Sequence, residues 1–195
     1  NALRLVFTPN LPPYMAISPE GNPQGLFIDI WRLWSKITGQ PVEFIAENMT
    51  EAITLINQNG ADLHIAYPGK DFSDTGLIPA NDVYTVFSKV YVSNHLPNII
   101  TLDDLSGKTL GVFKTAPYKN NIVARYPNIK IRYFSGFETL LKAAELKQID
   151  AMVASIENMN TQLINSNLQS SFYTIDTINF QSKISSLVSK DNEKL

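Results

Sequence analysis

Short apolar runs alternate with stretches of helical spacing along the whole chain, and this alternation predicts strands and helices that follow one another. The apolar runs predict strands at residues 3–7, 41–46, 63–66, 84–92, 108–113, 129–134, 151–154, 172–175 and 184–188. Apolar residues three and four apart predict helices at residues 27–38, 49–57, 117–125, 137–146 and 156–165, with a helical turn at 102–105. Strands alternating with helices are typical of the α/β class.

One arrangement occurs twice. In residues 51–66 and 138–154, a helix-like run leads through a polar turn to an aspartate, Asp62 or Asp150, and then to a short apolar strand. Two similar α/β units predict two lobes, lobe 1 from residues 3–88 with 182–195 and lobe 2 from residues 89–181. Two strands are expected to cross between the lobes, and a cleft between lobes is a common place for a small-molecule site.

Three further features of this pattern are informative. The helix at 27–38 places large apolar side chains on one face, so Trp31 and Trp34 are expected in the core. Residues 67–82 are rich in Gly, Pro, Asp and Ser and predict a long loop, which in compact domains is often functional. His64 lies within a strand and is expected to be an interior histidine with hydrogen-bond partners.

Composition narrows the function classes. A net charge of −2 and the lack of a Lys/Arg run give no basis for binding nucleic acid. The chain has no cysteine, which excludes disulfides and thiolate metal sites, and its two separated histidines indicate no metal centre. We therefore expect no metal and no cofactor. No apolar run reaches the length of a membrane span.

Ligands of open α/β sheets bind beyond the carboxyl ends of the strands. This rule selects polar and aromatic residues after the predicted strands of each lobe. In lobe 1 they are Asn10, Tyr14, Tyr67, Lys70 and Asp71. In lobe 2 they are Lys114, Thr115, Ala116, Ser135, Ser155 and Glu157.

Several of these residues have an alternative interpretation. Tyr14 follows two prolines and could be a packed turn aromatic rather than a ligand contact. Lys114 could pair with an anionic ligand or with Asp71, or be exposed to solvent. Asp74 could contact a ligand, or serve as a loop acid that caps Thr75 and Gly76.

The order and spacing of several motifs resemble the family 3 extracellular solute-binding proteins, whose fold is the type II periplasmic binding fold. The matching pieces are residues 3–6 (Leu-Arg-Leu-Val), 12–14 (Pro-Pro-Tyr), 25–30 (Gly-Leu-Phe-Ile-Asp-Ile), 60–62 (Gly-Ala-Asp), 102–112 and 149–151 (Ile-Asp-Ala). The resemblance implies two α/β lobes that are joined by two crossover strands and close on a ligand. Since residues 191–195 are polar, the family's C-terminal helices are expected to be missing.

The resemblance also bears on the ligand. Members that transport amino acids hold the ligand carboxylate with an arginine and its amino group with an aspartate. The corresponding positions are Asp74 and Ser155, while Tyr14, Tyr67 and Thr115 match other ligand positions. Because both charges of this strong clamp are missing, we expect a ligand other than a free α-amino acid.

Residues 25–39 are especially similar to periplasmic sensor domains of membrane-bound diguanylate cyclases and related receptors, including histidine kinases. This resemblance implies a periplasmic, non-enzymatic, ligand-sensing module tethered to the inner membrane by a segment after Leu195, with a homodimer as a further expectation. A solute-binding protein of an ABC importer is the alternative. An enzyme on the same scaffold is a third hypothesis, for which only separated acids such as Asp71, Asp74 and Glu157 are candidates.

Overall fold

The computed structural model describes residues 1–9, 11–67 and 75–192, and it confirms the α/β class. The chain divides into two compact units: unit 1 comprises residues 1–85 and 183–195, and unit 2 comprises residues 86–182. The boundaries predicted from the sequence lie at 88/89 and 181/182. Among the described residues, no helix is long and apolar enough to cross a bilayer.

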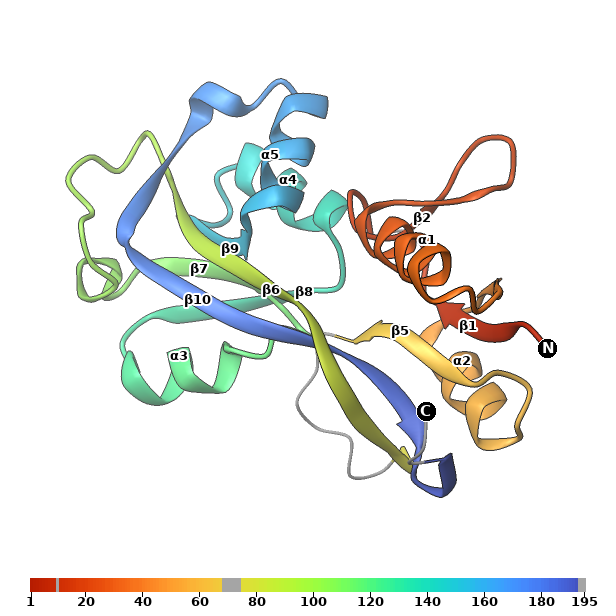
Figure 1. Ribbon diagram of the computed structural model, residues 1–195. Coiled ribbons are helices and arrows are strands. Elements are labelled where there is room, and N and C mark those ends of the chain that lie inside the picture. The colour runs from red at the N-terminus through yellow and green to blue at the C-terminus, as the bar shows by residue number, and fades with distance from the viewer. Residues whose placement is uncertain (10, 68–74, 193–195) are drawn as a thin grey trace. The chain divides into compact units, whose positions relative to one another are not determined.

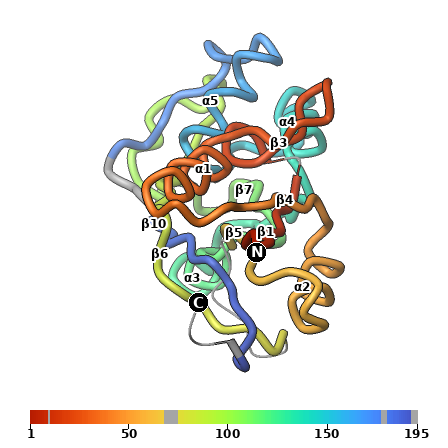
Figure 2. Tube along the Cα trace, turned by 45° about the vertical axis from the view of Figure 1, so that its right-hand side comes forward, coloured from red at the N-terminus to blue at the C-terminus, as the bar shows by residue number. Residues whose placement is uncertain are grey.

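Unit 1 is built on a mainly parallel sheet. Strand β1 (Leu3–Phe7) pairs in parallel with β4 (Val42–Ala46) and with β5 (Leu63–Tyr67), and the end of β10 (Phe172–Ser189) adds antiparallel to β5. Helices α1 (Leu26–Thr38) and α2 (Met49–Asn57) lie on opposite sides of β1 (Figures 1 and 2). A short hairpin, β2 (Ala16–Ile17) and β3 (Pro23–Gln24), precedes α1.

Unit 2 repeats this plan. Strand β7 (Thr109–Phe113) pairs in parallel with β8 (Lys130–Phe134) and β9 (Ala151–Ser155), and β6 (Leu77–Ser93) adds antiparallel to β9. Helix α3 (Lys119–Arg125) packs on one face of the sheet through Ile122. Helices α4 (Phe137–Glu145) and α5 (Ile156–Asn165) pack on the other face, as Figure 1 shows.

Short 3-10 turns complete the structure at Asp103–Leu105, Gln169–Ser171 and Lys190–Asn192. The strand order is β4-β1-β5-β10-β6-β9-β7-β8, and β6 and β10 are the two strands that run from one unit into the other. Ion pairs tie these two strands together within each unit: Lys183 to Asp82 at 2.8 Å in unit 1, and Lys89 to Asp176 at 3.1 Å in unit 2.

The two long strands correct the sequence prediction. Strand β6 begins at Leu77, so residues 77–82 belong to a strand and not to the predicted loop at 67–82. Strand β10 is one element and not the two predicted strands at 172–175 and 184–188. The physical reason is pairing: Asp82 accepts a hydrogen bond from Ser185 at 2.8 Å, so tertiary contacts hold polar segments in extended conformation.

The repeated aspartate has the same structural role in both units. In unit 1, the carboxylate of Asp62 accepts a hydrogen bond from the backbone N–H of Arg4 at 2.7 Å, and its own N–H donates to the Arg4 carbonyl at 2.9 Å. In unit 2, Asp150 makes the same pair of bonds with Thr109, both at 2.8 Å. Each aspartate thus joins the turn before one strand to the start of the neighbouring parallel strand.

The two aspartates differ in their side-chain partners, which leads to a prediction. The Arg4 guanidinium forms two more bonds to Asp62, at 3.2 and 2.8 Å, and holds the pKa of that carboxyl below its usual range. We expect Asp62→Ala to lower the free energy of unfolding by about 2 to 3 kcal/mol, and Asp150→Ala by about 1 kcal/mol. Urea denaturation of the two variants measures this difference, and equal midpoints would contradict it.

Helix α1 also departs from the prediction. Trp31 is half-buried, and its indole Nε1 donates to the Ile65 carbonyl at 3.2 Å. Trp34 is 37% exposed, so the expectation that it belongs to the core is wrong. The buried side chains of this helix are instead Phe27 and Ile28, because the sheet covers the helix along only one side.

Candidate functional site

The carboxyl ends of β8, β7 and β9 meet at one edge of the unit 2 sheet. Phe113 pairs with Phe134 and Gly111 pairs with Met152, so the residues that follow these strands lie side by side. This edge therefore brings together four of the residues selected from the sequence: Lys114, Thr115, Ser135 and Ser155. It is the place where parallel sheets of this kind bind ligands.

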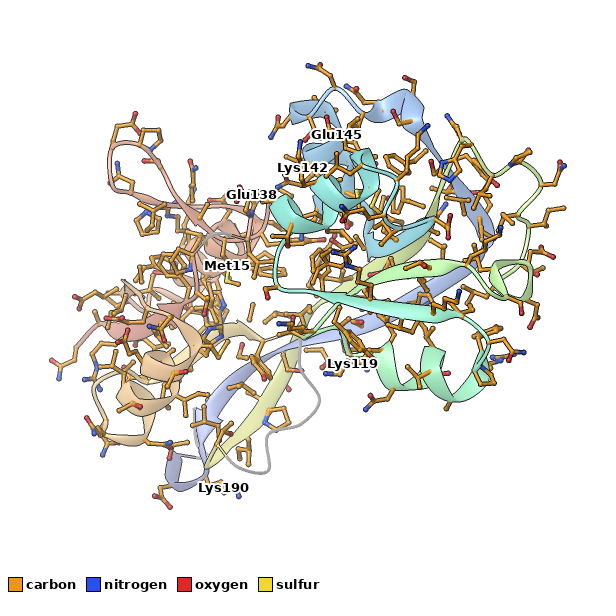
Figure 3. All side chains as sticks on the ribbon, turned by 180° about the vertical axis from the view of Figure 1, so that it is seen from behind. Met15, Lys119, Glu138, Lys142, Glu145 and Lys190 are labelled. Atoms are coloured by element: carbon orange, nitrogen blue, oxygen red, sulfur yellow. The ribbon has the colours of Figure 1, made fainter. Side chains whose placement is uncertain are left out.

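The turn after β7 is held by backbone groups. The N–H of Lys114 donates to the Phe134 carbonyl at 2.9 Å, and the Lys119 ammonium donates to the Lys114 carbonyl at 2.6 Å. Figure 3 shows Lys119 at the start of α3. The side chains of Lys114 and Thr115 are exposed, whereas Ala116 is buried in the core beside α3. Lys114 and Thr115 are thus available to a ligand, and Ala116 serves packing.

The turn after β9 contains polar atoms that lack partners. Ser155 ends β9 and is the N-cap residue of α5, and Asn158 lies in the first turn of that helix with only 5% of its surface exposed. Within the described part of the chain, Ser155 Oγ and Asn158 Oδ1 are buried and have no hydrogen-bond partner. Such groups are costly to bury without a partner and are rare in folded proteins.

Sequence reasoning selected Ser155 but missed Asn158. The signal that could have found Asn158 is its position three residues after the end of a strand, in the first turn of the next helix. Glu157, which was selected, is half-buried in the same turn. Burial, together with the negative charge of Glu157, raises the pKa of the Tyr91 hydroxyl to about 12. Tyr91 therefore stays a neutral phenol at physiological pH.

An aromatic pair missed from the sequence lies at the same edge. The rings of Phe113, the last residue of β7, and Phe137, the first residue of α4, have centroids 4.8 Å apart at an interplanar angle of 61°. Both rings are half-buried and pack against the apolar cluster formed by α4 and α5. An edge-to-face pair in this position can form an apolar wall next to the polar atoms.

Unit 1 places Tyr14 in a packed environment. Its ring is buried and stacks on Phe27, with centroids 5.0 Å apart and planes at 12°, and Tyr84 lies on another side at 6.2 Å. This is the arrangement of a packed turn aromatic, and a ligand contact through Tyr14 stays a prediction. Gly25 makes the packing possible, because a Cβ there would lie 2.4 Å from the Tyr14 carbonyl oxygen.

Tyr67 ends β5 next to an irregularity in the sheet. Ser185 pairs with Tyr67 but Leu187 pairs with His64, so two residues of β5, Ile65 and Ala66, lie opposite Ser186 alone. This β-bulge frees the Ile65 carbonyl, which accepts from Trp31 and from the Ser186 hydroxyl at 3.3 Å. Bulges are over-represented next to functional sites, and Tyr67 is the residue of β5 that follows this one.

His64 supports the same irregular segment. It is buried as predicted, with Nδ1 accepting from the Ala66 N–H at 3.3 Å and Nε2 lying 3.2 Å from Thr8 Oγ1. Since Nδ1 accepts, the neutral ring carries its proton on Nε2 and donates it to Thr8. Burial lowers the pKa of His64 to about 4, so the ring is uncharged at neutral pH.

Four selected residues, Asn10, Lys70, Asp71 and Asp74, lie outside the described residues, and their roles stay predictions. A pairing of Lys114 with Asp71 and the expected cleft between lobes also stay predictions. Within the described residues, no group of three His, Asp or Glu side chains could hold a metal ion.

Unit 2 also has a cavity of about 620 Å³ away from this edge, between α5 and β10. Its apolar walls include Tyr91, Leu163 and Phe172. Its acidic group, Asp176, already accepts from Lys89 at 3.1 Å and from the Thr174 hydroxyl at 2.9 Å. The carboxylate of this cavity is therefore already partnered, whereas Ser155 Oγ and Asn158 Oδ1 are without partners among the described residues.

Comparison with known families gives one match over part of the chain. Residues 3–71 match the model of the bacterial extracellular solute-binding proteins, family 3. No curated protein matches the sequence significantly. The resemblance inferred from the motifs is thus confirmed for this segment, which covers β1, α1, β4, α2 and β5.

Solved structures extend the similarity to the whole chain. The periplasmic VFT2 domain of BvgS from Bordetella pertussis has a TM-score of 0.81 at 14% identity, over 97% of this chain and 81% of that one. A histidine kinase sensor domain with similarity to periplasmic binding proteins has a TM-score of 0.78 at 14% identity, over 100% and 85%. An ancestral arginine-binding protein bound to arginine has a TM-score of 0.74 at 20% identity, over 99% and 86%. The fold is that of the type II periplasmic binding proteins.

Proposed function

We propose that this chain is a periplasmic, non-enzymatic domain that binds a small molecule and serves as the sensing module of a membrane receptor. The observation that carries the proposal is the pair of buried, unpartnered polar atoms in the described structure, Ser155 Oγ and Asn158 Oδ1, at the carboxyl edge of the unit 2 sheet. A ligand that hydrogen-bonds to both atoms would remove the cost of burying them.

The chemistry of this edge favours a particular kind of ligand. Asn158 Oδ1 is an acceptor, so the ligand must present an N–H or O–H donor to it, and Ser155 can donate or accept. The Phe113–Phe137 pair suits an apolar or aromatic portion of the ligand. No carboxylate stands at position 155 to pair with an ammonium group. We therefore propose a hydrogen-bonding ligand other than a free α-amino acid, arginine included.

Two alternatives are less well supported. An importer's solute-binding protein is favoured by the similarity to arginine-binding proteins, and the gene sequence beyond this chain distinguishes it from a receptor. A membrane span followed by a signalling domain would support the receptor, whereas neighbouring permease genes would support the importer. An enzyme is supported by no constellation of described side chains, and the structural neighbours named above are binding proteins or sensor domains.

The ligand hypothesis can be tested by thermal unfolding against a panel of metabolites. A ligand at one hundred times its dissociation constant should add about 2.7 kcal/mol to the free energy of unfolding. For a chain of this size, a gain of that order raises the melting temperature by about 5 to 10 °C. A panel that includes neutral heterocycles, sugars and amino acids, with no compound shifting the melting temperature, would contradict the proposal.

Substitution of Asn158 by leucine gives a sharper result. Removing the buried, unpartnered Oδ1 of Asn158 should change the stability of the free protein by no more than about 1 kcal/mol, because that oxygen accepts no hydrogen bond in the described structure. The same change should abolish the shift caused by the ligand, as should Ser155→Ala. Ser166→Ala, at the exposed C-terminal end of α5, is the matched control and should keep the full shift. Retention of the shift in Asn158→Leu would contradict the assigned site.

A further inference from the structure

Helix α1 carries a second apolar stripe on the side away from the sheet. Leu26, Ile30, Leu33 and Ile37 are spaced four, three and four residues apart, which is the spacing of a coiled-coil seam. Leu26 is 36% exposed, Leu33 57% and Ile37 75%, while Ile30 is half-buried. We call these four residues the α1 seam.

The α1 seam is not needed to hold the helix on unit 1. Phe27 and Ile28 provide the buried contacts, and the Trp31 indole donates to Ile65 in β5. Successive residues are separated by 100°, so the centre of the α1 seam lies ~90° from Phe27, ~130° from Trp31 and ~170° from Ile28 around the helix axis. The apolar surface of the helix is therefore wider than the part that the sheet covers.

The charged residues beside the α1 seam are complementary to the same residues of a second, antiparallel copy. Asp29 and Lys36 flank the seam on the same side and lie seven residues apart. If two such helices lie antiparallel around a two-fold axis near Leu33, Asp29 of each copy faces Lys36 of the other, twice per pair. Asp29 is also 3.2 Å from Arg32 one turn later, an exposed i,i+3 ion pair that contributes little by itself.

We propose that the α1 seam is a homodimerisation surface, where α1 of a second copy packs antiparallel on α1 of the first. An isologous contact of this kind needs only one patch that is complementary to itself, which the spacing and the charges provide. Three exposed apolar side chains, Leu26, Leu33 and Ile37, share this one helix face, whereas Ile164 stands on α5 and Ile100 in the loop before the turn at Asp103–Leu105.

The exposed area sets the strength of the association. The exposed fractions of the four side chains correspond to about 400 Å² of apolar surface per copy, the size of patches that mark interaction sites on monomers. With its polar rim, the contact lies near or below the ~800 Å² per partner of a standard interface. The dimer is therefore weak, with a dissociation constant in the micromolar range or above.

Sedimentation velocity of the whole chain, from about 10 µM to about 1 mM, tests the proposal. Wild type should pass from monomer to dimer, and Leu33→Glu should raise the dissociation constant at least ~tenfold, because it places a charge at the centre of the seam. Ile164→Glu, a similarly exposed apolar residue on α5 of unit 2, is the matched control and should leave the constant unchanged.

Charge reversal tests the antiparallel geometry. Asp29→Lys and Lys36→Asp should each weaken the dimer several-fold, because each creates two like-charged pairs, and the double variant should return to within about twofold of wild type. A chain that stays monomeric at about 1 mM, or a dimer equally sensitive to Leu33→Glu and Ile164→Glu, would overturn the proposal. So would binding of the monomer to phosphatidylglycerol vesicles that Leu33→Glu abolishes, since the seam would then cover a membrane.

Discussion

Replacing Gly25 by alanine should destabilise unit 1 by about 3 kcal/mol and displace the loop that contains Tyr14. Gly25 has φ 119°, a conformation that other residues rarely adopt, and an added Cβ would lie 2.4 Å from the Tyr14 oxygen and 2.9 Å from the Pro13 oxygen. Those oxygens accept from the Phe27 and Leu26 N–H groups at 3.0 Å, so the loop cannot move away without breaking hydrogen bonds of α1. Urea denaturation measures the loss of stability.

Gly21→Ala is the matched control for this prediction. Gly21 also has positive φ, 87°, but no atom lies within 4 Å of the position that an alanine Cβ would take, so only the conformational cost of about 1 kcal/mol is expected. Hydrogen exchange at the Leu26 and Phe27 amides should accelerate in Gly25→Ala and not in Gly21→Ala. Equal effects of the two substitutions would show that the close approach to Tyr14 does not matter.

The second large effect is a loss of stability on acidification that depends on His64. In the folded protein burial lowers the pKa of His64 to about 4, whereas an unfolded histidine titrates near about 6.5. Between these values the unfolded chain binds a proton that the folded chain does not. The contribution of His64 to the free energy of unfolding is therefore complete above pH ~6.5 and falls as the pH drops to ~4. The total loss over this range is about 3 kcal/mol.

Protonation would also place an N–H of His64 against the Ala66 N–H, two donors facing each other at the bulge before Tyr67. His64→Gln should be less stable at pH 7 but should lose this dependence between about pH 6.5 and 5, where most carboxylates remain ionised. Making both measurements in a His95→Gln background removes the other histidine. A slope in this pH range that His64→Gln leaves unchanged would contradict the prediction.

Local patterns were enough to predict most elements. Helix α2 was predicted at residues 49–57 and is found there, because its apolar spacing coincides with a local cap: Asn48 Oδ1 accepts from the Glu51 N–H at 3.0 Å. His64 was correctly placed inside because a histidine within an apolar strand is normally buried with partners. Both predictions succeeded because they depend only on residues that are close together in the sequence.

Features that depend on distant partners could not be predicted. Residues 77–82 contain Pro79, Asn81 and Asp82 and look like a loop, yet they form a strand because Lys183 and Ser185 bind Asp82. Trp34 was assigned to the core because periodicity shows that a helix has an apolar face but not how many faces are covered. Asn158 was missed because the lack of a hydrogen-bond partner is visible only in three dimensions.

Unit 1 is discontinuous in the chain, and this has a consequence for biosynthesis. Unit 2 occupies one uninterrupted stretch and can fold as soon as it leaves the ribosome, but the strand that covers β5 comes from residues 185–188. Until those residues emerge, nascent unit 1 exposes an unpaired edge next to the apolar side chains of Leu63 and Ile65. Release of β10 from the ribosome therefore ends the period in which nascent unit 1 is most exposed to aggregation.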